Sequence, residues 1–144
     1  MKREDIYRLA VFNLLRLVKG VTSMAINKVL VVDDSPAELT NIKSIVANTG
    51  CVVLSASNGQ EAVEIAKKET PDIIFMDIIM PDMDGYEATR RLNNDPLTRD
   101  IPIVFVSSKS QKADKLWAQM QGGKGYVTKP YTADKIIEQI KAFN

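Results

Sequence analysis

Short apolar runs alternate with longer amphipathic segments from residue 28 to the end of the chain. The apolar runs are rich in β-branched residues, which is typical of strands that are buried on both faces. They predict strands at 28–32, 51–56, 72–77, 102–107 and 125–128. The amphipathic segments that follow predict helices at 36–48, 58–69, 85–93, 111–121 and 133–142. Five β-α units in tandem predict an α/β fold with a parallel sheet and helices on both of its faces.

Capping and turn residues mark several of these boundaries. Ser35-Pro36-Ala37-Glu38 is typical of a helix start, with an N-cap, a proline in the first turn and a capping-box glutamate. Asn58 is a second N-cap, and Pro71 stops the helix that follows it. Residues 80–85 have the composition of a turn, and Gly122-Gly123 closes the helix predicted at 111–121.

Residues 1–24 lie outside the alternating pattern and form a segment of their own. Eight apolar residues share one broad face of a helical wheel: Ile6, Tyr7, Ala10, Val11, Leu14, Leu15, Leu17 and Val18. The opposite face carries Asp5, Arg8, Arg16 and Lys19, with Leu9 and Phe12 among them. We therefore predict an N-terminal amphipathic extension over 1–24, helical to about Gly20, and a globular domain over 25–144. The apolar stretch is too short and too polar to span a bilayer.

Composition narrows the function further. The chain has 144 residues, which suits one domain, and a net charge of +1. Residues 1–24 hold five basic and two acidic residues, and the rest of the chain 14 basic and 16 acidic, so we expect no nucleic-acid partner. The single cysteine, Cys51, excludes an internal disulfide and fits a reducing cytoplasm. The chain has no histidine, which excludes Ser-His-Asp and Cys-His catalysis, histidine-ligated metals and an internal phosphohistidine.

Polar residues gather where the predicted strands end. They are Asp33 and Asp34 after the first strand, Asp77 after the third, Ser107 after the fourth and Lys129 after the fifth. The carboxyl ends of parallel strands meet at one edge, where open α/β sheets bind ligands. Three neighbouring carboxylates need a cation, and oxygen ligands alone favour Mg²⁺. Each residue taken singly also fits an ordinary turn or strand end, and it is the conjunction of all five that indicates a site.

Four segments carry a family resemblance. Residues 30–35, 76–85, 106–108 and 125–130 have the sequences LVVDDS, MDIIMPDMDG, VSS and GYVTKP. In this order and spacing, over about residues 27–143, they resemble the receiver domains of bacterial two-component response regulators. The resemblance implies a CheY-like, flavodoxin-like, doubly wound five-stranded parallel sheet with its strands in the order 2-1-3-4-5.

The resemblance also implies residue roles. Asp77 would be the phosphoacceptor, and Lys129 and Ser107 would contact the phosphoryl group. Asp34, Asp77 and the main-chain carbonyl of Ile79 would bind Mg²⁺ directly, with Asp33 reaching it largely through water. Tyr126 would be the aromatic switch that moves inward with Ser107. The Lys129-Pro130 peptide bond is expected to be cis. Receivers more often have Thr at position 107, but the hydroxyl is retained and the switch should survive.

A finer resemblance covers residues 107–122. Ser107-Ser108-Lys109-Ser110-Gln111, then Asp114-Lys115-Leu116-Trp117 and Gln121-Gly122, resemble the pilus-associated (PilH-type) receivers of twitching motility. Ala113, Leu116, Trp117 and Met120 have i, i+3, i+4, i+7 spacing, which predicts that Trp117 lies in the core rather than on a partner surface.

The expected function is that of a phosphoacceptor that turns over once, with autodephosphorylation, rather than that of an enzyme. A sensor histidine kinase would be the phosphodonor, and a downstream protein would be the target, unless the domain is a phosphate sink. A haloacid-dehalogenase-type phosphatase is a rival, but that class has its nucleophile in an Asp-x-Asp motif after the first strand. A phosphorylation-independent binding module is the second rival, and the intact set of five site residues argues against it.

Several interpretations of residues 1–24 stay open. They could be an upstream extension from a start codon assigned too early, since Met24 stands where comparable receivers begin. They could instead pack against the receiver or pair in a homodimer, or they could contact a membrane surface.

Overall fold

The computed structural model describes residues 2–22 and 25–144. Helix α1 spans Arg3–Thr22 and precedes a β/α body formed by residues 25–144. The strands of the body are β1 (Lys28–Val32), β2 (Val52–Ala56), β3 (Ile73–Asp77), β4 (Ile103–Ser107) and β5 (Gly125–Thr128). Its helices are α2 (Pro36–Ala47), α3 (Gly59–Glu69), α4 (Gly85–Asn93), α5 (Lys112–Met120) and α6 (Ala133–Ala142). Every predicted strand and helix of the body is confirmed, with ends that differ by at most one residue.

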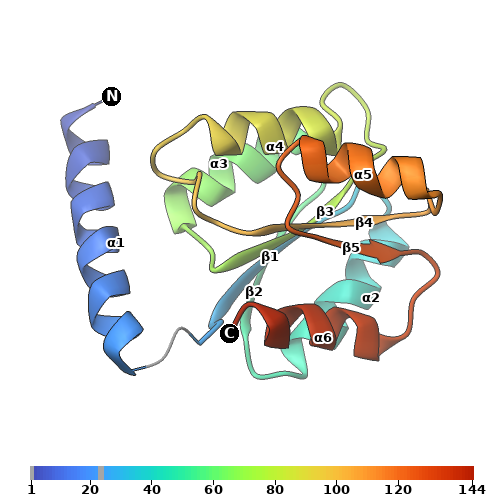
Figure 1. The fold of residues 1–144 in the computed structure, drawn as a ribbon, viewed down its shortest axis with the longest axis horizontal. Coiled ribbons are helices and arrows are strands. Elements are labelled where there is room, and N and C mark those ends of the chain that lie inside the picture. The colour runs from blue at the N-terminus through green and yellow to red at the C-terminus, as the bar shows by residue number, and fades with distance from the viewer. Residues whose placement is uncertain (1, 23–24) are drawn as a thin grey trace.

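The five strands form one parallel sheet in the order β2-β1-β3-β4-β5 (Figure 1), which confirms the flavodoxin-like order. In β1, Val29 pairs with Val53 of β2 on one side and with Ile73 of β3 on the other. The pairing of β3 with β4 ends at Asp77 and Val106, and that of β4 with β5 ends at Ser107 and Thr128. The strands therefore end together at one edge of the sheet.

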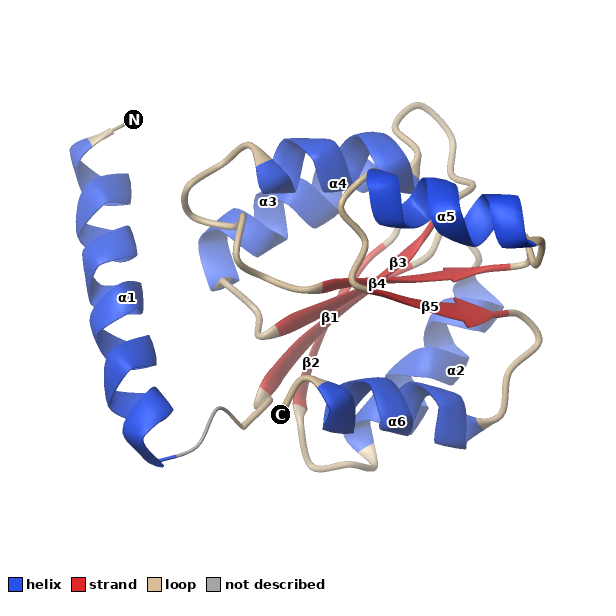
Figure 2. Ribbon diagram, in the orientation of Figure 1, coloured by secondary structure: helices blue, strands red, loops and turns tan. Residues whose placement is uncertain are grey.

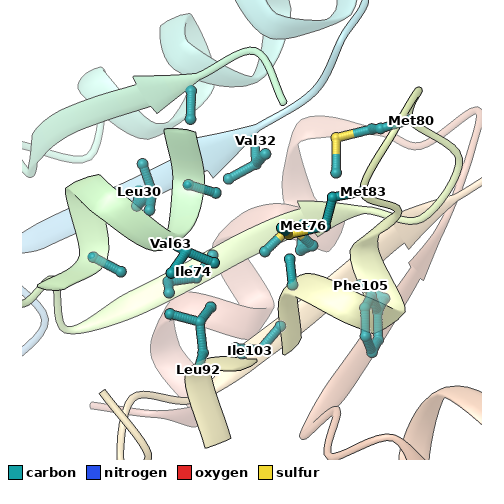
Figure 3. Close-up of a cluster of buried hydrophobic side chains, with 14 of the residues drawn as sticks. Leu30, Val32, Val63, Ile74, Met76, Met80, Met83, Leu92, Ile103 and Phe105 are labelled. Carbon is teal, nitrogen blue, oxygen red and sulfur yellow. The ribbon is translucent and has the colours of Figure 1, made fainter. Parts of the chain in front are cut away.

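Both faces of the sheet are buried. Helices α3, α4 and α5 cover one face, and α2 and α6 cover the other (Figure 2). Alternate residues of β3 divide between the two cores, with Ile74 and Met76 in the first and Ile73 and Phe75 in the second. Figure 3 labels ten side chains of the first core: Leu30, Val32, Val63, Ile74, Met76, Met80, Met83, Leu92, Ile103 and Phe105. Two buried faces explain why the strands are continuous apolar runs rather than alternating ones.

Helix α5 corrects one prediction. Trp117 is 49% exposed, and Leu116 and Met120 are also exposed, so the stripe predicted to be core faces outward. The helix instead packs through Ala118, which is 2% exposed. Beside it Gly123 lies so close to Phe105 that an added Cβ would stand 2.7 Å from the ring. The buried side of α5 is narrow because a small side chain and a glycine bring the chain close to the sheet.

Helix α1 confirms the predicted N-terminal helix, which ends at Thr22 rather than near Gly20. It stands beside the body (Figure 1), and its Arg8 guanidinium donates hydrogen bonds to the main-chain carbonyls of Lys67 and Lys68. These carbonyls belong to the last turn of α3, where the helix dipole favours a cation. Among the described side chains of α1, four large apolar ones are exposed: Ile6, Tyr7, Val11 and Leu14. The side chains of Phe12, Leu15, Arg16, Leu17, Val18 and Lys19, and the whole of Met24, lie outside the described residues.

Among the described residues, no helix combines the length and the apolar character needed to cross a bilayer.

Candidate functional site

The carboxyl edge of the sheet brings three aspartates together. Asp33 and Asp34 directly follow β1, and Asp77 is the last residue of β3, the strand next to it. One carboxylate oxygen from each lies within 4.8 Å of the other two. Asp33 and Asp77 are buried, whereas Asp34 is exposed. The cluster therefore opens to solvent on the side of Asp34.

The environment of Asp77 disfavours its ionised form. Burial, followed by the charge of Asp33, raises the pKa of Asp77 to about 6, against the lowering effect of Lys129 and of the Ile78 N–H. That N–H donates to Asp77 Oδ1 at 2.8 Å. A cation bound among these carboxylates would relieve their mutual repulsion. The donor set is made of oxygen alone and is partly open to water, which fits Mg²⁺.

Lys129 supplies the positive charge of the cluster. Its Nζ donates to Asp33 Oδ2 at 2.9 Å and to Glu38 Oε2, and it stands 3.7 Å from Asp77 Oδ1. Burial lowers the pKa of the ammonium, but hydrogen bonds to Glu38 and Asp33 outweigh it, and the net pKa is raised. The main-chain N–H of Lys129 donates to the Ser107 carbonyl at 2.8 Å, and the Lys129-Pro130 bond is cis, as predicted.

The loop after β3 is held tightly against Asp77. Met80 and Met83 are buried, and Asp82 has a φ of 68°, a left-handed conformation that aspartate tolerates better than most residues. Gly85 donates its N–H to the Ile78 carbonyl at 2.8 Å. A Cβ at Gly85 would lie 2.1 Å from the Asp77 carbonyl oxygen. The glycine therefore lets α4 begin directly behind Asp77. The side chain of Ile79, in the same loop, is exposed.

Ser107 is the last residue of β4, and Tyr126 is the second residue of the neighbouring strand β5, where it pairs with Phe105. Ser107 is 1% exposed, and its Oγ accepts the Lys109 N–H at 3.2 Å. The Tyr126 hydroxyl donates to the Lys109 carbonyl at 2.7 Å. Burial raises the pKa of Tyr126, and a hydrogen bond with the Ser107 side chain opposes the rise. The serine, the tyrosine and the loop at Lys109 thus form one connected group beside the carboxylates.

Glu38 is the residue of this site that the sequence pattern did not indicate. The Ser35 side chain accepts the Glu38 N–H as predicted, at 3.4 Å, but the Glu38 carboxylate does not return to the Ser35 N–H. That N–H donates to Asp33 Oδ1 at 2.9 Å instead. The predicted capping box is therefore only half formed, because Lys129 draws the carboxylate of Glu38 into the site. The sequence signal for Glu38 is limited to its position about one helical turn after Asp34, since only the fold brings Lys129 to it.

Comparison with known proteins points to one family. The family model described as the response regulator receiver domain matches residues 29–141. Protein PilH of Pseudomonas aeruginosa is 40% identical over 115 residues, which cover 80% of this chain and 95% of that protein.

Solved structures agree with this. The chemotaxis protein CheY4 of Vibrio cholerae superposes with a TM-score of 0.78 at 26% identity, covering 83% of this chain and 100% of the other. The receiver domain of the sensor histidine kinase PA1611 from Pseudomonas aeruginosa has a TM-score of 0.76 at 27% identity, covering 83% of this chain and 98% of that one. The latter contains a magnesium ion coordinated in its active-site cleft.

Proposed function

Because this chain belongs to the response-regulator receiver family, we propose that it accepts a phosphoryl group on Asp77 from a partner histidine kinase. The observation that carries the proposal is the position of Asp77, whose carboxylate is gathered with those of Asp33 and Asp34 while Lys129 Nζ stands 3.7 Å away. A nucleophile, a set of metal-binding oxygens and a fixed cation are the parts that phosphoryl transfer to a carboxylate requires.

The transfer itself needs no general base. A carboxylate oxygen of Asp77 attacks phosphorus, the bond from phosphorus to the donor breaks, and the donor leaves with that electron pair. The product is an acyl phosphate on Asp77. With a pKa of about 6, Asp77 is mostly ionised at neutral pH even without a bound cation. Since a carboxylate is a weak nucleophile, positioning and charge neutralisation by Lys129 and the metal site supply the rate.

Mg²⁺ is the proposed cofactor. Asp34, Asp77 and the main-chain carbonyl of Ile79 would hold it directly, with Asp33 acting largely through water. When bound, the ion would neutralise charge on the phosphoryl oxygens. Mg²⁺ should raise the melting temperature of the wild type more than that of Asp34→Ala, because it binds the native state. Equal shifts in the two proteins would contradict the role of Asp34.

Labelling with a small phosphodonor tests the acceptor. Incubation with acetyl phosphate and Mg²⁺ should add a single phosphoryl mass to the wild type and none to Asp77→Asn, whose side chain is nearly isosteric. Labelling of the wild type that stays stoichiometric also separates a receiver from a phosphatase, which would turn over a phosphomonoester. Undiminished labelling of Asp77→Asn would show that another residue is the acceptor.

We propose that Ser107 and Tyr126 transmit phosphorylation to a protein target. The phosphoryl oxygens would draw the Ser107 hydroxyl inward, and the Tyr126 ring would follow and lose its bond to the Lys109 carbonyl. The readout would then lie on the face of β4, α5 and β5, where Leu116, Trp117 and Met120 are exposed. Amide-shift mapping with the phosphoryl mimic beryllofluoride should show changes there. Changes confined to the loop after β3 would contradict the switch.

We propose a role in type IV pilus, twitching or chemotaxis-like control in the cytoplasm, supported by the resemblance of residues 107–122 to PilH-type receivers and by the 40% identity to PilH. The domain would act as a single-turnover phosphoacceptor with autodephosphorylation, signalling through protein contact. A phosphate sink is the alternative, and it would label normally while binding no target. Comparing the rates at which the histidine kinases of one genome label this protein would identify its donor.

We propose that residues 1–24 are an extension that is separate from this chemistry. Arg8 forms the described hydrogen bonds between α1 and the body, and the carbonyls that it meets are on α3 rather than at the carboxyl edge. The exposed apolar side chains of α1 are better suited to a second copy of the chain or to another surface than to the receiver itself. Light scattering of the full chain at several concentrations tests for the homodimer.

A further inference from the structure

Lys129 is bound more closely to two other carboxylates than to the proposed acceptor. Its ammonium has three N–H donors, and it donates to Asp33 at 2.9 Å and to Glu38. The 3.7 Å separation from Asp77 Oδ1 is an ion pair rather than a hydrogen bond. In this state of the site, therefore, most of the hydrogen-bonding capacity of Lys129 is directed away from the atom that would receive the phosphoryl group.

Of the two carboxylates bound to Lys129, that of Glu38 can break its hydrogen bond with the smaller loss of free energy. Its side chain is 47% exposed, against 7% for Asp33, so its carboxylate can return to water without burying an unpaired charge. Its backbone N–H remains bonded to Ser35 whichever way the carboxylate points. Its carboxylate also has no capping duty, since Asp33 accepts the Ser35 N–H. The helix start therefore does not depend on the Glu38 charge.

Charge gives the direction of the effect. Phosphorylation would replace the single negative charge of the Asp77 carboxylate with about two negative charges at pH 7, beside Asp33, Asp34 and Glu38. The new oxygens would compete with Glu38 for the Lys129 ammonium and would repel its carboxylate. We infer that Glu38 is a positioning residue that holds Lys129 away from Asp77 before phosphorylation and releases it afterwards.

This inference rests on the proposed phosphoacceptor function and adds a regulatory residue to it. The Glu38–Lys129 pair stabilises the unphosphorylated state, so its strength sets how readily the site changes to the phosphorylated one. Removal of the Glu38 charge should have opposite effects on two ligands. It should favour an anionic phosphoryl mimic, because Lys129 is free to bind it. It should disfavour Mg²⁺ alone, because the released ammonium then pairs more fully with Asp33 and Asp77.

Calorimetric titration of the full chain tests both effects. Each protein is titrated with Mg²⁺ alone and then with beryllofluoride at saturating Mg²⁺. We expect Glu38→Gln to bind beryllofluoride about two- to fivefold more tightly than the wild type, the scale of one partly exposed ion pair. The same variant should bind Mg²⁺ more weakly than the wild type. Glu38→Asp, which keeps the charge on a shorter side chain, should return both affinities toward the wild-type values.

Glu61→Gln is the matched control. Glu61 lies in the first turn of α3, as Glu38 does in α2, and its carboxylate accepts from the Ser57 hydroxyl at 3.1 Å. It should leave both affinities unchanged. Wild-type beryllofluoride affinity in Glu38→Gln, or a shift of both ligands in the same direction, would overturn the inference alone. A wild type that binds no beryllofluoride would overturn the proposed function as well.

Discussion

The carboxyl edge of the sheet and the N-terminal helix α1 differ in how far the rest of the chain holds their side chains in place. At the edge, Asp33, Asp77, Ser107 and Lys129 are each held by named neighbours from several strands and loops. On α1, Ile6, Val11 and Leu14 face solvent, and Arg8 makes the bonds to the body that the structure describes. At the carboxyl edge, packing by the rest of the chain determines where each side chain lies. In α1, the amphipathic sequence determines that the segment is helical but does not determine what its apolar face contacts.

The two regions should differ most in how strongly a single substitution changes the free energy of unfolding. Gly85→Ala would place a Cβ 2.1 Å from the Asp77 carbonyl oxygen, which belongs to β3, a strand paired with β1 on one side and β4 on the other. We expect the free energy of unfolding to fall by about 3 kcal/mol, the upper part of the range for overpacking. Urea unfolding measures it. Leu14→Ala on α1 should change the same quantity by less than about 0.5 kcal/mol, because its side chain is exposed. Equal effects of the two substitutions on the free energy of unfolding would contradict the proposed difference in packing between the edge and α1.

A smaller effect concerns charge at the edge. The pKa of Asp77 rises from 3.8 to about 6 on folding. Ionisation of Asp77 therefore lowers the free energy of unfolding as the pH rises between these two values, and the loss is complete above the higher one. Asp77→Asn removes this loss. Without divalent metal at pH 7.5, Asp77→Asn should unfold with a free energy about 1–3 kcal/mol higher than the wild type, at 1.36 kcal/mol per pKa unit.

The same comparison at pH 4 provides the control. There the wild-type carboxyl is protonated in the folded state, and the difference between the two proteins should largely disappear. Addition of Mg²⁺ at pH 7.5 should also narrow the difference, since the proposed metal site would bring the ion to the wild-type carboxylate. A stability difference that did not depend on pH would mean that packing, rather than charge repulsion, separates the two side chains.

The smallest effect on the site should come from removing the N-terminal extension. Deletion of residues 1–23 should leave Asp77 labelling within a few-fold of the full chain and change the free energy of unfolding by no more than about 1 kcal/mol, the scale of one hydrogen bond. It should change the oligomeric state or the solubility, which light scattering measures. Lost labelling in a folded truncation would show that α1 supports the site. No change in any property would favour an extension without a role in this protein.

The sequence predicted the strands and helices of the body well because the central strands β1, β3 and β4 are buried on both faces. A run such as Ile73–Phe75 has only one stable place in a parallel sheet, and Asn58 and Pro71 leave little freedom at the helix ends. The same logic predicts that Asp33, Asp34 and Asp77 meet at one edge, because each follows or ends such a strand.

Two features could not be predicted in this way. The apolar spacing of α5 indicates an amphipathic helix but not which side faces the sheet. The helix packs on the sheet through the small residues Ala118 and Gly123, which leaves Trp117 exposed. The Ser35–Glu38 spacing predicts a capping box from local chemistry alone. Lys129 comes from the far end of the chain, and only the folded sheet places its ammonium beside Glu38. Both errors arise where tertiary contacts outweigh local patterns.

The position of the phosphoryl group tests the central claim most directly. The wild type is labelled with acetyl phosphate and Mg²⁺ and then treated with borohydride, which reduces an aspartyl phosphate to homoserine and leaves free carboxylates unchanged. Peptide mass spectrometry then locates the homoserine. Conversion at position 77 alone, absent without acetyl phosphate, is the predicted result. Homoserine at position 33, 34 or 82 with Asp77 intact, or stoichiometric phosphorylation without any homoserine, would contradict the assignment of Asp77 as the acceptor.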